Sequence, residues 1–161
     1  MLPDLRGRPA PRQPGEERIH GTTIAVGEAG ILLRGASGAG KSLLALAIIA
    51  LAGQAGRFGR LVADDRTALA ARGDRLIARP VPPLEGIVER RGLGLTPEPA
   101  TPAAVVRLVV DLTGEEPPRM QEPEELVDNL CGIDLPRLRV TRRAGDERLV
   151  LAALDLFTCH G

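Results

Sequence analysis

Aromatic side chains are almost absent from this chain of 161 residues, which contains two phenylalanines and neither tyrosine nor tryptophan. Apolar residues still make up 43% of the sequence, which is ordinary for a globular domain. The core must therefore be built from leucine, valine, isoleucine and alanine. The length of the chain suits a single domain.

The chain also has no net charge and few cysteines. The 21 basic and 21 acidic residues cancel, and such a balance gives no general support for binding to nucleic acid or to an anionic membrane. The two cysteines, Cys131 and Cys159, are not spaced like metal ligands. We therefore predict no nucleic-acid partner and no membrane partner, and we expect both cysteines to pack as free thiols.

Long apolar segments are also missing. No stretch has the unbroken apolar length of a membrane span, and the N-terminal residues lack the apolar region of a secretory signal. Residues 1–17 are rich in proline, glycine and charge, a composition typical of a flexible lead-in. We predict a cytoplasmic protein with one domain over residues 18–161.

Short apolar runs and glycine-rich turns predict a chain of strands with few helices. The strand, helix and strand between Ile31 and Ala63 predict a parallel pair of strands with a right-handed crossover. The predicted strands are Ile19–Val26, Ile31–Arg34, Leu61–Ala63, two within Arg66–Ile87, and Val105–Leu112; the predicted helices are Lys41–Ala52 and a short one at Glu124–Leu130; a hairpin is predicted from Leu138–Thr141 and Leu149–Leu154.

Residues 35–42 match the phosphate-binding pattern G-x-x-x-x-G-K-[ST] without a mismatch. The segment follows an apolar strand and opens an apolar helix, so a chance glycine-serine loop is the weaker interpretation. Backbone N–H groups and the helix N-terminus can hold phosphate oxygens, while Lys41 reaches the outer phosphates and Ser42 binds Mg²⁺. The predicted nucleotide-binding residues are Gly35, Ala36, Ser37, Gly38, Ala39, Gly40, Lys41 and Ser42.

Two adjacent acids, Asp64 and Asp65, end the next predicted strand. In parallel α/β sheets, ligands collect at the carboxyl ends of strands, so one acid can lie near Mg²⁺ and the other near the attacking group. We predict Asp64 as a metal ligand on this basis. The alternative is a solvated turn, which aspartate also favours.

Several motifs occur in an order that resembles HPr kinase/phosphorylase over roughly residues 19–155: His20-Gly21, the loop at 35–42, Leu61–Asp65 and the string Glu89–Leu95. That family phosphorylates a serine of HPr, the small phosphocarrier of the sugar phosphotransferase system, and can also remove the phosphate. The resemblance implies ATP and Mg²⁺ as cofactors and an HPr-type carrier as partner. It also implies an α/β P-loop kinase domain with a mixed sheet, similar to the nucleotide-binding architecture of phosphoenolpyruvate carboxykinase.

The resemblance assigns catalytic roles to four residues. Asp65 would take the serine proton in the kinase direction and return one in the phosphorylase direction, as a single carboxylate can. His20 would support this acid, and Lys41 would neutralise phosphate charge. Arg119 is similar in position to an arginine that the family uses in catalysis, where a guanidinium can stabilise a transferring phosphoryl group.

For the metal, the resemblance implies Ser42 and Glu89 as Mg²⁺ ligands, which are hard oxygens for a hard cation. It also implies a homo-oligomer, a hexamer in the family. The apolar residues Leu126, Val127 and Leu130 are candidates for its contacts, although they could equally belong to the core.

The chain departs from the family pattern at both ends. Too few residues precede His20 for the family's further N-terminal domain, so we expect the short form that contains the catalytic domain alone. The family's arginine-proline-glycine loop appears here as Arg142–Glu147 without the proline. We therefore expect the kinase activity more than the phosphorylase activity.

Other functions stay open on the same residues. The chain could transfer a phosphoryl group to a different acceptor, or act as a nucleotide-binding switch without catalysis. The acids Asp64 and Asp65 together with Glu89 argue against a pure switch, because binding alone has less need of a positioned acid. Pyrophosphate is an alternative donor to ATP.

Overall fold

Strand β1 (Glu17–Val26) is central to the structure, because three other strands pair with it. Strand β2 (Ala29–Arg34) runs antiparallel to it along one edge. Strands β3 (Gly59–Ala63) and β4 (Arg66–Arg72) follow one another along the other edge, also antiparallel. The computed structural model describes residues 9–159, so the first eight residues of the predicted lead-in lie outside it.

The large sheet closes on itself. Strand β4 pairs with β5 (Arg75–Pro80), β5 pairs with β8 (Ala104–Leu112), and β8 returns to pair with β2. Beyond this closed circuit, β8 also pairs with β10 (Ile133–Val140), and β10 pairs with β9 (Val127–Leu130). The β2–β8 and β8–β10 pairs are parallel and the other pairs are antiparallel, which confirms the predicted mixed sheet in an α/β domain.

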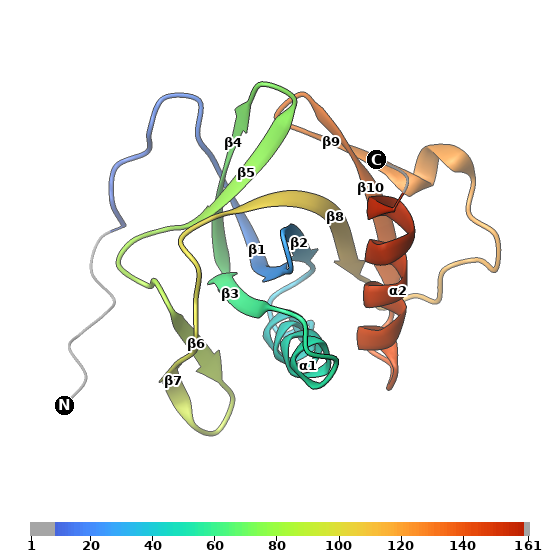
Figure 1. Cartoon of the computed structure of the whole chain (residues 1–161), viewed down its shortest axis with the longest axis horizontal. Helices are drawn as coiled ribbons and strands as arrows, with labels where there is room; N and C mark the ends of the chain where they lie inside the picture. Colours follow the sequence, from blue (N-terminus) through green and yellow to red (C-terminus); the bar gives the residue numbers. More distant parts are fainter. Residues whose placement is uncertain (1–8, 160–161) are drawn as a thin grey trace.

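Two apolar cores lie on the two faces of this sheet. Helices α1 (Lys41–Gln54) and α2 (Asp146–Thr158) pack beside one another over the outer face (Figure 1). The second core is contributed by inward-facing residues of the closed circuit and β10, including Leu32, Leu69 and Val109. In the described chain, every buried apolar side chain is leucine, valine, isoleucine or alanine, which confirms the expectation from the missing aromatics.

A small hairpin of β6 (Ile87–Arg90) and β7 (Gly94–Pro97) extends from the body of the molecule at the lower left of Figure 1. It carries the glycine-rich string that contributed to the family resemblance. Val88 of β6 is buried in the outer core with α1. The base of the hairpin is therefore fixed against the helix that follows the glycine-rich loop.

The predicted hairpin near the C-terminus is wrong. Its first half lies in β10, but Leu149–Leu154 is part of α2. Within this segment Val150, Leu151 and Leu154 are buried, while Leu149 is 49% exposed. A short apolar run fits either a strand or a helix face, and here the contact with α1 stabilises the helix.

Two further predictions need correction. Strands β2 and β3 do run in the same direction, but they are not neighbours because β1 lies between them. The helix expected over Glu124–Leu130 is only a 3₁₀ turn, η1 (Pro123–Leu126), after which β9 begins. Pairing of β9 with β10 satisfies the backbone groups there, and this tertiary contact overrides the local helical preference.

The candidate contact residues for an oligomer are partly on the surface. Leu126 is 37% exposed and Val127 is 47% exposed, whereas Leu130 packs against the inner core. The homo-oligomer stays a prediction.

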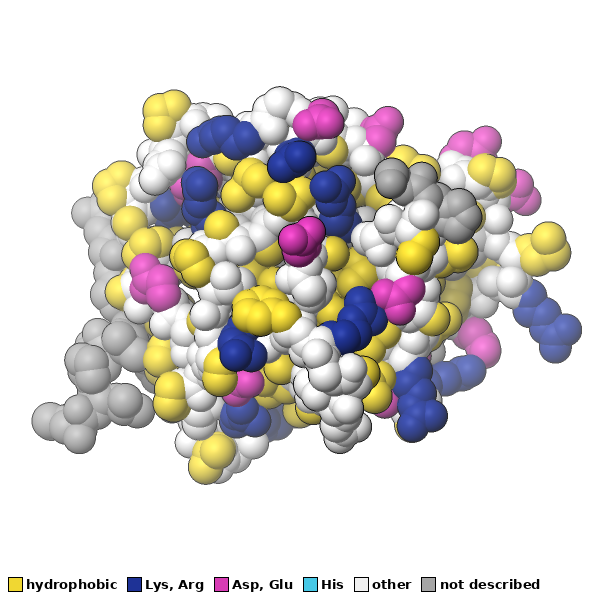
Figure 2. Space-filling view, in the orientation of Figure 1, with side chains coloured by type: hydrophobic (Ala, Val, Ile, Leu, Met, Phe, Trp, Pro, Cys, Tyr) yellow, Lys and Arg dark blue, Asp and Glu magenta, His cyan; other side chains and the backbone are white. Residues whose placement is uncertain are grey.

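No helix within residues 9–159 is long and apolar enough to cross a membrane. Figure 2 shows basic and acidic side chains interspersed over one face of the molecule.

Candidate active site

The glycine-rich loop connects β2 directly to the N-terminus of α1, as its motif requires. Gly38 and Gly40 have φ angles of 78° and 94°, values that a residue with a Cβ adopts only under strain. The Lys41 side chain folds back over the loop, and its Nζ donates hydrogen bonds to the carbonyl oxygens of Gly35 (3.0 Å) and Ala36 (3.1 Å). The loop thus holds the Lys41 ammonium at the N-terminus of α1, which is the positive end of the helix. This concentration of positive charge suits a phosphate group.

The two predicted acids lie where β3 passes into β4, and we call Asp64-Asp65 the acidic break. The strand pairs with β1 on both sides of it, through Ala63 with Thr23 before the break and Arg66 with His20 after it. The ladder also shifts register one step earlier, between Thr23 and Ile24. Asp65 has a φ of 63°, so the backbone turns there and aims the two carboxylates in different directions.

Asp64 is 9% exposed, and its carboxylate receives three hydrogen bonds. Ser42 Oγ and Thr22 Oγ1 both donate to Asp64 Oδ1, at 2.6 Å and 2.8 Å. The backbone N–H of Glu89 donates to Oδ2 at 3.2 Å. These bonds connect the start of α1, strand β1 and the β6–β7 hairpin to one carboxylate.

Asp65 faces a different partner. Its Oδ1 lies 3.2 Å from His20 Nδ1, and the two side chains are 62% and 46% exposed. His20 Nε2 in turn lies 3.4 Å from Lys41 Nζ. A lysine ammonium only donates, so Nε2 accepts and the ring proton resides on Nδ1, where it points at Asp65. This carboxylate is thus oriented by a histidine and open to an incoming molecule.

The oxygens at the acidic break fit a magnesium ion. Ser42 and Asp64 supply a hydroxyl and a carboxylate whose oxygens lie 2.6 Å apart, and Mg²⁺ usually takes one or two protein oxygens together with water and phosphate. The side chain of Glu89 is exposed and only its backbone contacts Asp64. Within residues 9–159, no three carboxylate, histidine or cysteine side chains form a ready-made metal cluster.

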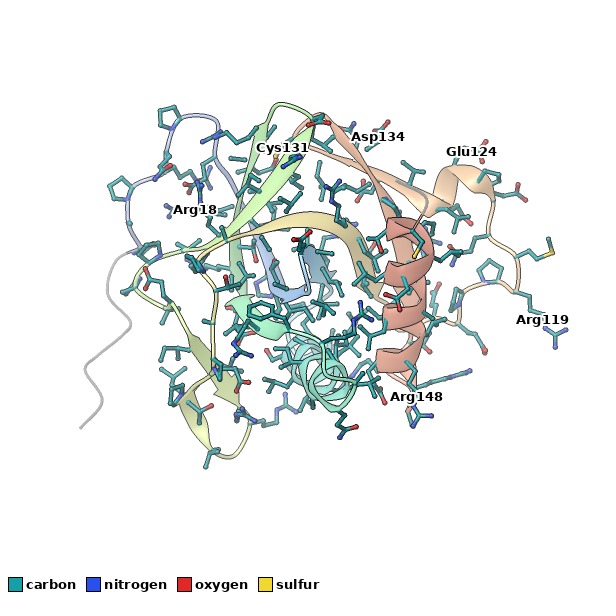
Figure 3. All side chains as sticks on the ribbon, in the orientation of Figure 1. Arg18, Arg119, Glu124, Cys131, Asp134 and Arg148 are labelled. Carbon is teal, nitrogen blue, oxygen red and sulfur yellow. The ribbon has the colours of Figure 1, made fainter. Side chains whose placement is uncertain are left out.

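Arg119 is not brought to this group of residues. It lies on the exposed connection between β8 and η1, and Figure 3 shows its side chain pointing away from the body at the right-hand edge. Its predicted catalytic role stays a prediction. Of the other predicted site residues, His20, Lys41, Ser42, Asp64 and Asp65 are connected to one another by a single network of short polar contacts that passes through Thr22.

The sequence did not point to Thr22, and it indicated Arg142 only as part of the segment Arg142–Glu147. Thr22 contacts the acidic break, although nothing in the sequence pattern separates it from other strand threonines. Arg142, which has a φ of 65°, donates from Nη1 to the carbonyl oxygen of Gly38 at 3.2 Å. On the hairpin side, Arg91 Nη2 lies 3.7 Å from the position that a Cβ on Gly38 would occupy. The guanidinium groups of Arg142 and Arg91 thus both lie near the loop, and a guanidinium group binds phosphate well.

A cleft of about 320 Å³ opens beside the acidic break. It is lined by residues 63–66 on one side and by the proline-rich segment 80–84 on the other. An acceptor group placed in this cleft would meet Asp65 directly. The cleft therefore offers space for an acceptor next to the acid that could take its proton.

The cysteines take no part in the site. Both are free: Cys131 is half-buried and Cys159 is exposed. Burial of the Cys131 thiol, together with its hydrogen bond to Glu17, raises the pKa of the thiol. A raised pKa disfavours the reactive thiolate.

Taken together, the fold and the site define a mixed α/β domain in which a glycine-rich strand–loop–helix segment lies beside a pair of acids with separate hydrogen-bond partners. The family model of the HPr Serine kinase C-terminal domain matches residues 15–151 of this chain. The chain therefore belongs to that family.

Individual relatives agree with this assignment. HPr kinase/phosphorylase of Geobacillus thermodenitrificans is 31% identical over 144 residues, covering 83% of this chain and 45% of the relative. The enzyme of the same name from Lactobacillus acidophilus is 28% identical over 152 residues, covering 88% and 44%. The chain thus spans less than half the length of these relatives.

A solved structure has the same fold. The Hpr(Ser) kinase/phosphatase from Coxiella burnetii superposes with a TM-score of 0.68 at 23% identity, covering 89% of this chain and 90% of that one. The large mixed sheet with its two helices is therefore an arrangement that a solved protein also adopts.

Proposed function

We propose that this chain is a Mg²⁺- and ATP-dependent protein serine kinase that phosphorylates an HPr-type phosphocarrier. The observation that supports this proposal most is that the two carboxylates of the acidic break face different partners. Asp64 turns towards Ser42 and the loop, and Asp65 turns towards His20 and solvent. Phosphoryl transfer needs one group near the metal and another near the attacking oxygen.

In this mechanism, the backbone N–H groups of the loop and Lys41 hold the phosphates of ATP. Ser42 and Asp64 would hold Mg²⁺, which would supply positive charge that offsets the negative charge of the phosphates. The serine hydroxyl of the carrier attacks the γ-phosphorus, the bond to the bridging oxygen breaks, and Asp65 takes the serine proton. His20 orients Asp65 through its Nδ1–H.

The phosphorylase direction uses the same residues in reverse. Inorganic phosphate would attack the phosphoserine, and Asp65 would return the proton to the leaving serine oxygen. The kinase direction is the better supported of the two, because the segment Arg142–Glu147 lacks the family's proline. Arg142 still contacts the loop.

A phosphotransferase with another acceptor is the second candidate. The cleft beside Asp65 is large enough for a small polar molecule, which favours this candidate over a switch without catalysis. A pure switch also gives no reason for the exposed carboxylate of Asp65 to be held by a histidine.

The test is phosphate transfer from γ-labelled ATP to a purified HPr-type carrier, with wild type, Lys41→Ala and Asp65→Asn. We expect label on a carrier serine with wild type. Asp65→Asn should lower the rate about 10²–10⁴-fold, which is the usual contribution of a general base, while nucleotide binding persists.

Lys41→Ala should lose nucleotide binding as well as transfer, since it removes the cation from the loop. If wild type binds ATP through Lys41 but labels no carrier, the substrate assignment is wrong. The second candidate then takes precedence.

A further inference from the structure

Thr22 lies directly opposite the acidic break in the β-ladder. It is fully buried, at 0% exposure, and the neighbouring pairs Thr23 with Ala63 and His20 with Arg66 bracket it. A buried hydroxyl is costly unless it is hydrogen-bonded. The partners of this hydroxyl therefore indicate what the residue does.

The Thr22 hydroxyl contacts both acids. Its Oγ1 donates to Asp64 Oδ1 at 2.8 Å and accepts the backbone N–H of Asp65 at 3.3 Å. A hydroxyl carries one donor and two acceptor lone pairs, so it can make both bonds at once. On the same strand, the Gly21 N–H donates to the carbonyl oxygen of Asp65 at 2.9 Å. Strand β1 thus holds the backbone of Asp65 at both its N–H and its C=O group.

These bonds matter because Asp65 has a left-handed backbone, with a φ of 63°. Such a conformation costs a residue with a Cβ about 1–3 kcal/mol unless the surroundings enforce it. The bond from Asp65 N–H to Thr22 helps to enforce the turn that separates the two carboxylates. The bond to Asp64 holds that carboxylate on the Ser42 side.

We propose that Thr22 is a positioning residue that sets Asp64 for the metal and Asp65 for proton transfer through a single hydroxyl. This inference rests on the proposed phosphotransfer function, and it deepens that function by naming the residue that keeps the two acids in separate roles. Because Thr22 is fully buried and bonds to both acids, it acts through them.

Thr23 provides a matched control. It is also a threonine of β1 with 0% exposure, but its Oγ1 lies 2.9 Å from Thr67 Oγ1 and makes no hydrogen bond to either acid. Thr22→Val and Thr23→Val therefore each delete one threonine hydroxyl, from the same strand and at the same burial. Thr22→Ser keeps the hydroxyl and removes only a methyl group.

The first arm measures steady-state kinetics of the full chain with the carrier and with ATP. Residues that orient ligating or catalytic groups are worth about 10–100-fold. We expect Thr22→Val to lower kcat by about this factor and to raise the Mg²⁺ concentration needed for tight nucleotide binding, with the KM for the carrier nearly unchanged. Thr22→Ser should recover most of the kcat, and Thr23→Val should lose stability without these changes.

The second arm needs no ligand. Hydrogen exchange at the Asp65 amide should speed up in Thr22→Val and stay slow in Thr22→Ser and Thr23→Val, because only the first variant removes its acceptor. An amide that stays protected in Thr22→Val overturns the proposal, and so does a Thr22→Val enzyme whose kinetics match those of Thr23→Val. If wild type transfers no phosphate to the carrier, the proposed substrate fails while hydrogen exchange and Mg²⁺ dependence still decide the role of Thr22.

Discussion

The glycine-rich loop and the acidic break are the two halves of the site, and they are built in different ways. The loop is local: its shape comes from glycines at positive φ, and its lysine bonds to carbonyls five and six residues away. The acidic break is non-local, since Thr22 reaches Asp64 across 42 positions of sequence. Local geometry tolerates change elsewhere in the fold, whereas geometry that depends on a paired strand does not.

The largest expected effect is a loss of stability when a side chain of either apolar core is truncated. Ile48 of α1 belongs to the outer core and Leu69 of β4 belongs to the inner core, and both are 0% exposed. Truncating either one to alanine should lower the free energy of unfolding by about 2–5 kcal/mol, because each change leaves a cavity. Chemical denaturation measures this.

Leu43→Ala is the control for this pair. Leu43 belongs to the same helix but is 69% exposed, so its truncation should cost much less. A cost for Leu43→Ala equal to that of Ile48→Ala would contradict the assignment of the α1 face that packs on the sheet.

The next effect concerns the strand end that precedes the loop. Arg34 donates to Asp111 Oδ1 and Oδ2 at 2.7 Å and 2.9 Å, and Arg137 donates to Oδ2 at 2.5 Å. Burial acts to raise the pKa of Asp111, but the hydrogen bonds and charges of Arg34 and Arg137 outweigh it and hold the pKa below its ordinary value. The carboxylate of Asp111 therefore takes up a proton more readily in the unfolded chain than in the folded chain.

The stabilisation from Asp111 is thus fully present at neutral pH and is lost as the pH falls below about 4. Asp111→Asn should lower the free energy of unfolding by about 1.5–3 kcal/mol at pH 7, the range for hydrogen bonds to charged groups. The difference in unfolding free energy between this variant and wild type should become smaller in acid. Denaturation series at both pH values check this. A difference of constant size would show that the charge of Asp111 is not the source of the stability.

The smallest of the three effects tests the loop itself. A Cβ added to Gly40 would lie 2.7 Å from Arg142 Nε, and its φ of 94° disfavours any other residue. Gly40→Ala should cost about 1–2 kcal/mol locally and weaken nucleotide binding about tenfold. Titration with a fluorescent nucleotide measures the affinity.

Gly53 is the matched control, since it lies in α1 with open space where a Cβ would lie and no positive φ. Gly53→Ala should leave nucleotide affinity unchanged and stabilise the helix by about 0.5–1 kcal/mol. Equal loss of affinity in both variants would mean that the loop geometry is not what binds the phosphates.

Most of the elements could be predicted, and so could the position of the glycine-rich loop before α1, because their signals are contiguous. The glycine-rich motif, the apolar strand before it and the apolar helix after it occupy one unbroken segment, so their spacing alone indicates the arrangement. The apolar run at Leu149–Leu154 was assigned wrongly because its short length suits a strand or a helix, and only packing against α1 distinguishes them. The place of β1 between β2 and β3 depends on pairing between distant segments and leaves no local signal.

By itself, the sequence determined the core composition, the glycine-rich loop, the adjacent acids and the family resemblance, because these depend on residue identity and short spacing. Only the tertiary structure decided that Asp64 and Asp65 face different partners, that Thr22 and Arg142 contact them and the loop, and that Arg119 points away. The physical reason is that a side chain's role depends on which neighbour satisfies its hydrogen bonds. For Thr22 and Asp64, that neighbour comes from a strand 42 positions away.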